Sequence, residues 1–131
     1  MTLKNFLAFA AVVAAFFGLY LLLAPMTFLQ QNGVEASAGA ALMAQSVGCT
    51  LLGLAVINWL ARKDVNSPVT WGVVWGNIVV HGLGLIVDLM GGANGVYTKN
   101  AFVGPVVHII FIVGFGYFVL RRPKAATPAG G

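Results

Sequence analysis

The sequence predicts an all-α fold, a four-helix transmembrane bundle with both chain ends on the cytoplasmic side. Four long apolar runs cover approximately residues 3–24, 39–61, 69–91 and 101–120. Each has about the 20 residues that a helix needs to cross the hydrocarbon core. Charged side chains inside these runs are limited to Lys4 and Asp88. Only 8% of all residues are charged, against about 25% in soluble domains, so we expect the chain to fold in lipid.

The distribution of basic residues predicts the orientation. Six of the seven Lys and Arg residues lie on one face of an even-spanning bundle, namely Lys4, Arg62, Lys63, Arg121, Arg122 and Lys124. The opposite face has only Lys99. Because short loops rich in Lys and Arg stay in the cytoplasm, both termini are predicted to be cytoplasmic, in a bacterial inner membrane. The net charge of +4 therefore indicates topology and not a nucleic-acid partner.

The first run ends at Pro25, because proline cannot continue the helical hydrogen-bond ladder. Its apolar stretch is longer than the ~7–15 residues of a signal peptide, so we expect a retained span. The connection after it, residues 26–38, contains the turn signal Asn32-Gly33, and its first part could lie along the membrane surface. The second run leaves the membrane through Trp59, an aromatic residue suited to the headgroup level.

The third run follows a short connection, in which Ser67 or Asn66 can cap the helix and Pro68 suits its first turn. So short a connection makes the second and third runs antiparallel neighbours. The fourth run begins near Ala101. We expect a single transmembrane domain over residues 1–122 and a disordered cytoplasmic tail over 123–131, which is too poor in apolar residues to pack.

A few polar side chains lie inside the runs, where burying a polar group is costly. In the third run Asn77, His81 and Asp88 share one helix face with Gly84, at ~100° per residue. The direction of each run predicts the depth of these residues. His81 lies near mid-membrane, whereas Gln45, Asp88 and His108 lie in the outer half. The candidate pocket residues are Gln45, Asn77, His81, Asp88 and His108, with Asn58 as a further buried amide and Glu35 in the loop above.

Three interpretations of this cluster stay open. Histidine is a common metal ligand, but the sequence has no His-x-x-x-His and no Cys pair, so we predict no metal site. A His–Asp pair suits proton transfer, which accompanies quinone chemistry or coupled transport. Alternatively, the polar groups form hydrogen bonds between helices and fix their packing. We assign no catalytic residue, since no phosphate loop, nucleophile elbow or haem-attachment motif is present.

Glycines supply the candidate helix-packing positions. Gly72 and Gly76 form a small-xxx-small motif, whose spacing lets two backbones approach closely. The contact could form inside the bundle or with another subunit. The other candidate packing positions are Gly18, Gly48 and Gly84.

Part of the chain resembles small bacterial four-helix membrane proteins of the DoxX-like group. The resemblance rests on Leu23-Ala24-Pro25, on the run Ala41-Leu42-Met43-Ala44-Gln45-Ser46-Val47-Gly48, on Leu51-Leu52-Gly53-Leu54 and on Leu60-Ala61-Arg62. It implies a four-helix bundle that is sometimes a partner of quinone-linked redox enzymes. Many such proteins have an arginine near the place that Gln45 occupies here.

Two functions follow from these observations. The first is a non-enzymatic integral membrane subunit that stabilises a larger inner-membrane complex of respiratory or photosynthetic type. Its partners would be the lipid bilayer and other membrane subunits or copies of itself. The alternative is a quinone-linked redox or proton-coupled small-molecule transport protein with an intramembrane His/Asp pocket. A quinone is the cofactor that this alternative would take.

Overall fold

The computed structural model describes residues 1–97 and 101–122, and in these ranges the chain is all-helical. The helices are α1 (Leu3–Leu23), α2 (Pro25–Gln31), α3 (Ala38–Ala61), α4 (Pro68–Ala93) and α5 (Val103–Leu120). In this part of the chain α1, α3, α4 and α5 are long and apolar enough to cross a membrane. The predicted four-helix transmembrane fold is therefore confirmed. The predicted disordered tail, 123–131, lies outside the described residues.

Serine caps mark where α3 and α4 begin. The hydroxyl of Ser67 accepts a hydrogen bond from the Val69 amide at 3.1 Å, and Pro68 occupies the first turn of α4, as predicted. Ser37 caps α3 in the same way, with its hydroxyl 3.1 Å from the Ala40 nitrogen. These oxygens satisfy backbone N–H groups that have no partner within their helix.

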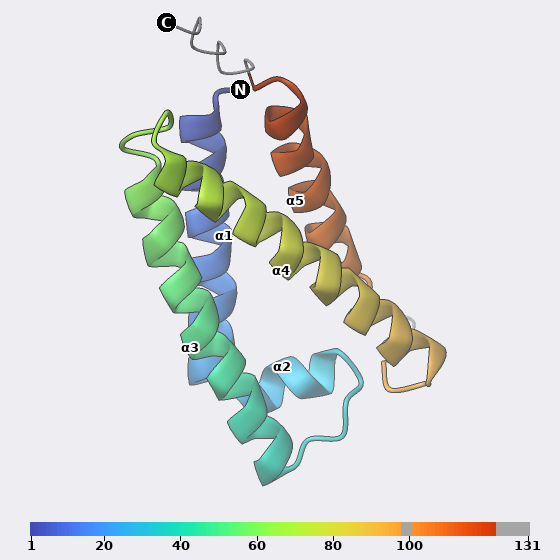
Figure 1. Cartoon of the computed structure of the whole chain (residues 1–131). Coiled ribbons are helices and arrows are strands. Elements are labelled where there is room, and N and C mark those ends of the chain that lie inside the picture. Colours follow the sequence, from blue (N-terminus) through green and yellow to red (C-terminus); the bar gives the residue numbers. More distant parts are fainter. Residues whose placement is uncertain (98–100, 123–131) are drawn as a thin grey trace, which may run out of the picture.

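Pro25 not only ends α1 but also opens α2, a helix that the sequence did not predict. Proline is well tolerated at a first helical position, where its missing N–H costs nothing. Figure 1 shows α2 running crosswise to α1 and α3, beyond the end of α1. Leu29 is its buried residue, and Phe28 places its ring 5.6 Å from that of Tyr20. The expectation that this connection follows the membrane surface stays a prediction.

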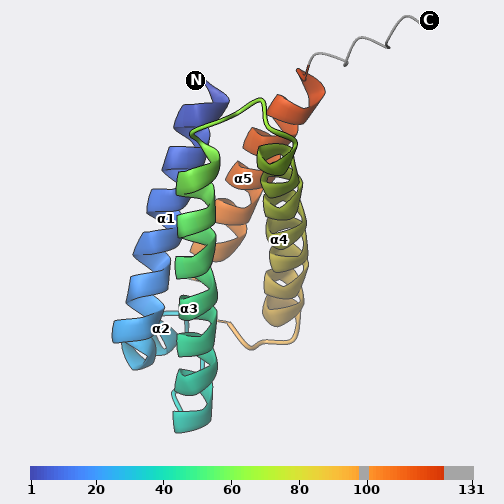
Figure 2. The same cartoon turned by 60° about the vertical axis from the view of Figure 1, so that its left-hand side comes forward.

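The long helices are arranged as two antiparallel pairs, α1 with α3 and α4 with α5 (Figures 1 and 2). In Figure 1, α3 and α4 meet where residues 62–67 join them and diverge toward their other ends. The α1–α3 pair is close because of Gly18 and Gly48. A Cβ atom on Gly48 would lie 2.8 Å from the Gly18 carbonyl oxygen, too near for any side chain.

The apolar core lies at the end of the bundle where α1 begins and α5 ends. It consists of Leu3, Phe6, Leu7, Ala10, Val74, Phe111 and Phe115. The ring of Phe6 is central, since it meets Phe115 edge-on at 4.7 Å and lies against Gly114, where a side chain would collide with it. This core joins the two helix pairs at one end only. The candidate pocket residues therefore lie mostly beyond it, on α4 and α5.

Candidate functional site

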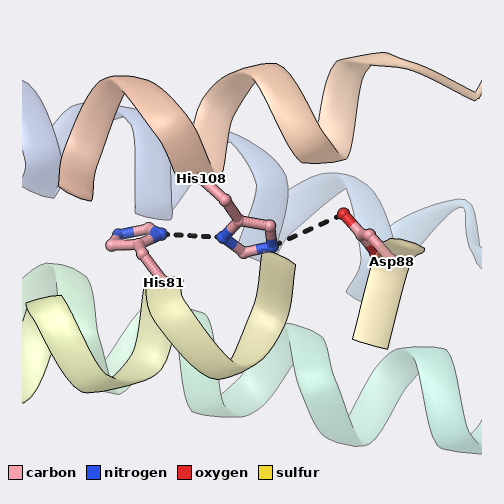
Figure 3. A network of polar contacts seen from close by, with 3 residues as sticks. All are labelled: His81, Asp88 and His108. Carbon is pink, nitrogen blue, oxygen red and sulfur yellow. Dashed lines mark hydrogen bonds and ion pairs between the residues drawn. The ribbon is translucent and has the colours of Figure 1, made fainter. Parts of the chain in front are cut away.

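Three ionisable side chains lie in series between α4 and α5 (Figure 3). The Nδ1 atoms of His81 and His108 lie 2.9 Å apart. On the other side of the same ring, Nε2 of His108 lies 3.6 Å from Oδ2 of Asp88. His108 thus stands between the other two groups. We call these three residues the relay.

The periodicity of α4 explains why His81 and Asp88 face the same neighbour. The buried stripe of this helix contains Thr70, Val74, Asn77 and His81, at intervals of four, three and four residues. Continuing the pattern gives Gly84 and Asp88. Such spacing keeps side chains on one helix face. The predicted common face is the buried face of α4: it meets α3 at Asn77 and α5 at His81, Gly84 and Asp88.

Gly84 makes room for the central histidine. A Cβ atom at this position would lie 2.6 Å from Nε2 and 3.0 Å from Nδ1 of His108. The imidazole of His108 therefore lies directly over the bare backbone of α4, between the positions of His81 and Asp88. Any residue other than glycine at position 84 would displace this ring.

Gly104 does the same for the carboxylate. Oδ2 of Asp88 occupies the place where a Gly104 side chain would be, so the carboxylate lies against the first turn of α5. No side chain caps this helix start. The positive end of a helix dipole favours an anion, so α5 helps to hold the negative charge of Asp88. Among the described residues Oδ2 has no hydrogen-bond partner, and His108, which is charged only when protonated, is its ion-pair partner.

Phe111 fixes the other end of the relay. Its ring stacks on that of His81 at a centroid distance of 4.6 Å and an interplanar angle of 19°. His81 is only 8% exposed, and Phe111 belongs to the apolar core. Stacking against a buried ring restricts imidazole rotation, so Nδ1 of His81 stays directed at His108.

Tyr97 lies next to the Asp88 end of the relay, just beyond α4. Its ring packs where a Gly91 side chain would otherwise stand. Burial raises the pKa of the Tyr97 phenol, and the negative charge of Asp88 raises this pKa further. Tyr97 therefore stays neutral at physiological pH and adds no charge to the relay.

Asn77 shares a helix face with His81 and Asp88, but it does not join the relay. It pairs with Asn58 of α3 through two amide hydrogen bonds, of 2.8 and 3.2 Å. Its amide nitrogen also donates to the Val73 carbonyl at 2.8 Å. Both side chains are fully buried. The pair lies one helical turn from His81 and ties α3 to α4, outside the relay.

Gln45 lies apart from the relay as well. Its side-chain nitrogen donates to the Leu22 carbonyl at 3.2 Å, within the α1–α3 pair. Glu35 is exposed in the connection before α3. Of the residues expected to converge, only His81, Asp88 and His108 therefore meet. Helix rotation decides this outcome, and the spacing of residues along one helix does not fix it.

The packing glycines separate into two groups. Gly18, Gly48 and Gly84 each lie against a neighbouring helix. Gly72 and Gly76 are exposed, and no described atom of a neighbouring helix lies within 4 Å of where their Cβ atoms would be. They do not pack against any other helix that the structure describes, because they lie on a different face of α4 from the stripe that meets α3 and α5. Contact with another chain stays a prediction.

The relay has the geometry of a proton-binding site. A nitrogen–nitrogen contact of 2.9 Å requires one imidazole to donate and the other to accept, so the two rings share a proton. When His81 is the donor, neutral His108 carries its own proton on Nε2, which faces the Asp88 carboxylate at 3.6 Å. Within the described residues no group of three or more His, Cys, Asp or Glu side chains could hold a metal ion.

Four apolar helices long enough to span a membrane, with this part-buried polar network between two of them, define a small multi-pass membrane protein. Comparison with protein-family models, with curated proteins and with solved structures finds no match to this chain.

Proposed function

We propose that this protein couples proton transfer either to quinone-linked redox chemistry or to the transport of a small molecule. His81, His108 and Asp88 are its proton relay. One observation carries the proposal: three ionisable groups from two helices lie in series, joined by a hydrogen-bond contact of 2.9 Å and an ion-pair separation of 3.6 Å. Ionisable groups within membrane spans are costly and mark proton relays or ligand pathways. Structural hydrogen bonding alone would not need three titratable residues in series.

The charge of the relay changes in a way that suits coupling. Two neutral imidazoles and one carboxylate carry a single negative charge. When one proton binds, to His108 or to Asp88, the relay as a whole becomes neutral. A neutral group is far cheaper to keep in lipid than an unpaired charge. Proton binding therefore lowers the free-energy cost of exposing this part of α4 and α5 to the apolar interior of the membrane.

The surroundings favour proton exchange at one end of the relay. Toward the end of the bundle that holds the core, His81 is followed by the Asn58–Asn77 pair and by Val74, all fully buried. Amide groups do not titrate between pH 5 and 8, in contrast to histidine. The Asp88 end lies in the last turns of α4, close to the connection that follows. We expect protons to enter and leave by way of Asp88.

Proton flux into proteoliposomes tests the proposal. Purified protein is reconstituted with a pH-sensitive dye inside, and an imposed potassium diffusion potential drives protons inward, with and without decylubiquinone as a quinone probe. We expect wild-type protein to acidify the interior, and Asp88→Asn and His108→Gln to reduce the rate to that of empty liposomes. Glu35→Gln, which removes an exposed carboxylate, is the matched control and should behave as wild type.

Either of two results would contradict the proposal. One is a wild-type rate equal to that of empty liposomes under both conditions. The other is an Asp88→Asn rate equal to the wild-type rate. A flux that depends on decylubiquinone would support the quinone-linked form of the function, whereas a flux that is independent of it would support the transport form.

A second candidate function is the integral subunit of a larger inner-membrane complex. The observation that favours it is the exposed face of α4 with Gly72 and Gly76, which no other helix of the described chain covers. Such a face allows close approach of a foreign helix. Extraction in a mild detergent, native gel separation and mass spectrometry test it. Migration with a large complex supports a subunit, and migration alone rejects it.

A further inference from the structure

A groove lies between α3 and α4 at the end where residues 62–67 connect them. Its volume is about 370 Å³. Apolar side chains form its walls, with Ile57 and Leu60 from α3 and Val69 and Val73 from α4. Lys63 and Asp64 lie at its rim, in the connection. Apolar walls below a charged rim follow the same order as the acyl chains and headgroup of a lipid.

The walls and the rim are accessible. Ile57 is 50% exposed, Leu60 53% and Val69 76%, so the groove opens to the surface along its length. The rim is nevertheless held in place. The buried Thr70 hydroxyl lies 2.9 Å from the Ala61 carbonyl oxygen and 2.7 Å from that of Asp64, which ties the connection to the start of α4. The groove therefore has a fixed polar end and open apolar walls.

The two rim charges are opposite and uncommitted. Within the described residues neither Lys63 nor Asp64 takes part in an ion pair, and both side chains are exposed. One oxygen of Asp64 accepts a hydrogen bond from the Asn66 amide at 3.2 Å, which orients its carboxylate. A cation and an anion next to each other at the headgroup level complement a headgroup that itself has both charges.

We infer that this groove binds an aminophospholipid of the phosphatidylethanolamine type. The lipid phosphate pairs with the Lys63 ammonium, and the primary ammonium of the headgroup donates hydrogen bonds to the Asp64 carboxylate. One acyl chain lies along Ile57, Leu60, Val69 and Val73. A purely anionic lipid would meet Asp64 unfavourably, and a quaternary ammonium has no N–H to donate. The inference does not depend on the proton relay.

Native mass spectrometry of the full-length protein in a mild detergent tests this inference. Phosphatidylethanolamine, phosphatidylcholine and phosphatidylglycerol with identical acyl chains are added in equal amounts. We expect wild-type protein to retain phosphatidylethanolamine about fivefold better than phosphatidylcholine, because only the primary ammonium can donate a hydrogen bond to Asp64 and one net hydrogen bond supplies a factor of about this size. Asp64→Asn should abolish this preference, and Lys63→Gln should weaken all three lipids. Lys4→Gln, a cation of α1 outside the groove, should change nothing.

Two further probes separate the lipid from its headgroup. Val69→Trp fills an exposed part of the groove wall and should weaken all three lipids without altering the rim. Water-soluble glycerophosphoethanolamine should fail to displace bound lipid, because it has no acyl chain. The inference is overturned by equal retention of phosphatidylethanolamine and phosphatidylcholine, by an unchanged preference in Asp64→Asn, or by displacement with the soluble headgroup alone.

Discussion

At the residue scale, Gly84 sets the position of the His108 ring. A methyl group there would enter the space of the imidazole, so Gly84→Ala should move His108 and break at least one step of the relay. Overpacking of this kind costs about 1–3 kcal/mol. Gly82 is the matched control, because a Cβ atom there meets no neighbouring group within 4 Å.

Proton flux in proteoliposomes measures the difference between the two variants. Gly84→Ala should lose most of the flux, whereas Gly82→Ala should keep it. Equal fluxes in the two variants would show that the placement of His108 over position 84 is not needed.

The Asn58–Asn77 pair allows a prediction about stability. Removing one partner leaves the other amide buried and unpaired, so Asn58→Ala and Asn77→Ala should each lower the free energy of unfolding by about 1–3 kcal/mol. The double variant should cost less than the sum of the two single variants, by about 1 kcal/mol. Equilibrium unfolding in mixed micelles measures all three. Strict additivity would mean that the two amides do not interact.

At the element scale, the α1–α3 pair depends on the crossing of Gly18 and Gly48. Gly48→Ile would push the backbone of α1 away, because a Cβ atom at position 48 already lies within 3.1 Å of Leu21 and Leu22 atoms. We expect a loss of roughly 1–3 kcal/mol in stability. Gly53→Ile, on the open face of α3, should be neutral.

Thermal unfolding of the two variants in the same detergent measures this difference. If Gly53→Ile destabilises the protein as much as Gly48→Ile does, loss of glycine itself and not the close crossing would explain the effect.

The elements could be predicted well because their signals are local. Apolar length gave the four spans, and the Ser67–Pro68 start of α4 followed from capping chemistry. The helix α2 was missed, since its seven residues carry too short an apolar pattern to distinguish a surface helix from a loop. Pro25 was a usable signal, because a proline that ends one helix is also suited to open the next.

The site could be predicted only in part. Spacing along α4 correctly grouped His81 with Asp88, since one helix fixes its own faces. Spacing could not show that His108 would lie between them, that Gln45 would turn toward α1, or that Asn77 would pair with Asn58. Each of these depends on the rotation of two helices relative to each other. Gly84 was a hint, because a bare backbone position on the polar face leaves room for a facing side chain.

At the scale of the whole molecule, the orientation of the bundle stays a prediction. The start of α1 and the end of α5 lie at the same end (Figure 1). Arg62, Lys63, Arg121 and Arg122 are near this end, so it should face the cytoplasm. Alkaline phosphatase and green fluorescent protein fused after the last residue measure the side. Fluorescence without phosphatase activity is expected, and phosphatase activity alone would reverse the assignment.

The two-pair architecture places the relay within one pair and the core between the pairs. The relay joins α4 to α5, whereas the core joins α1 to α4 and α5 near one end. Phe111 links the two, because its ring stacks on that of His81 and its centroid lies 5.7 Å from that of Phe6. A change in relay charge can therefore reach the core through Phe111.

The hydrogen bond between the two histidines is the most direct test of the account. The chain has only two histidines, so labelling with ¹⁵N-histidine reports on the relay alone. We predict a scalar coupling between Nδ1 of His81 and Nδ1 of His108 across a shared proton, at the contact of 2.9 Å. His108→Gln should abolish this coupling. Two uncoupled imidazoles in the wild-type protein, each titrating independently of the other, would contradict the relay.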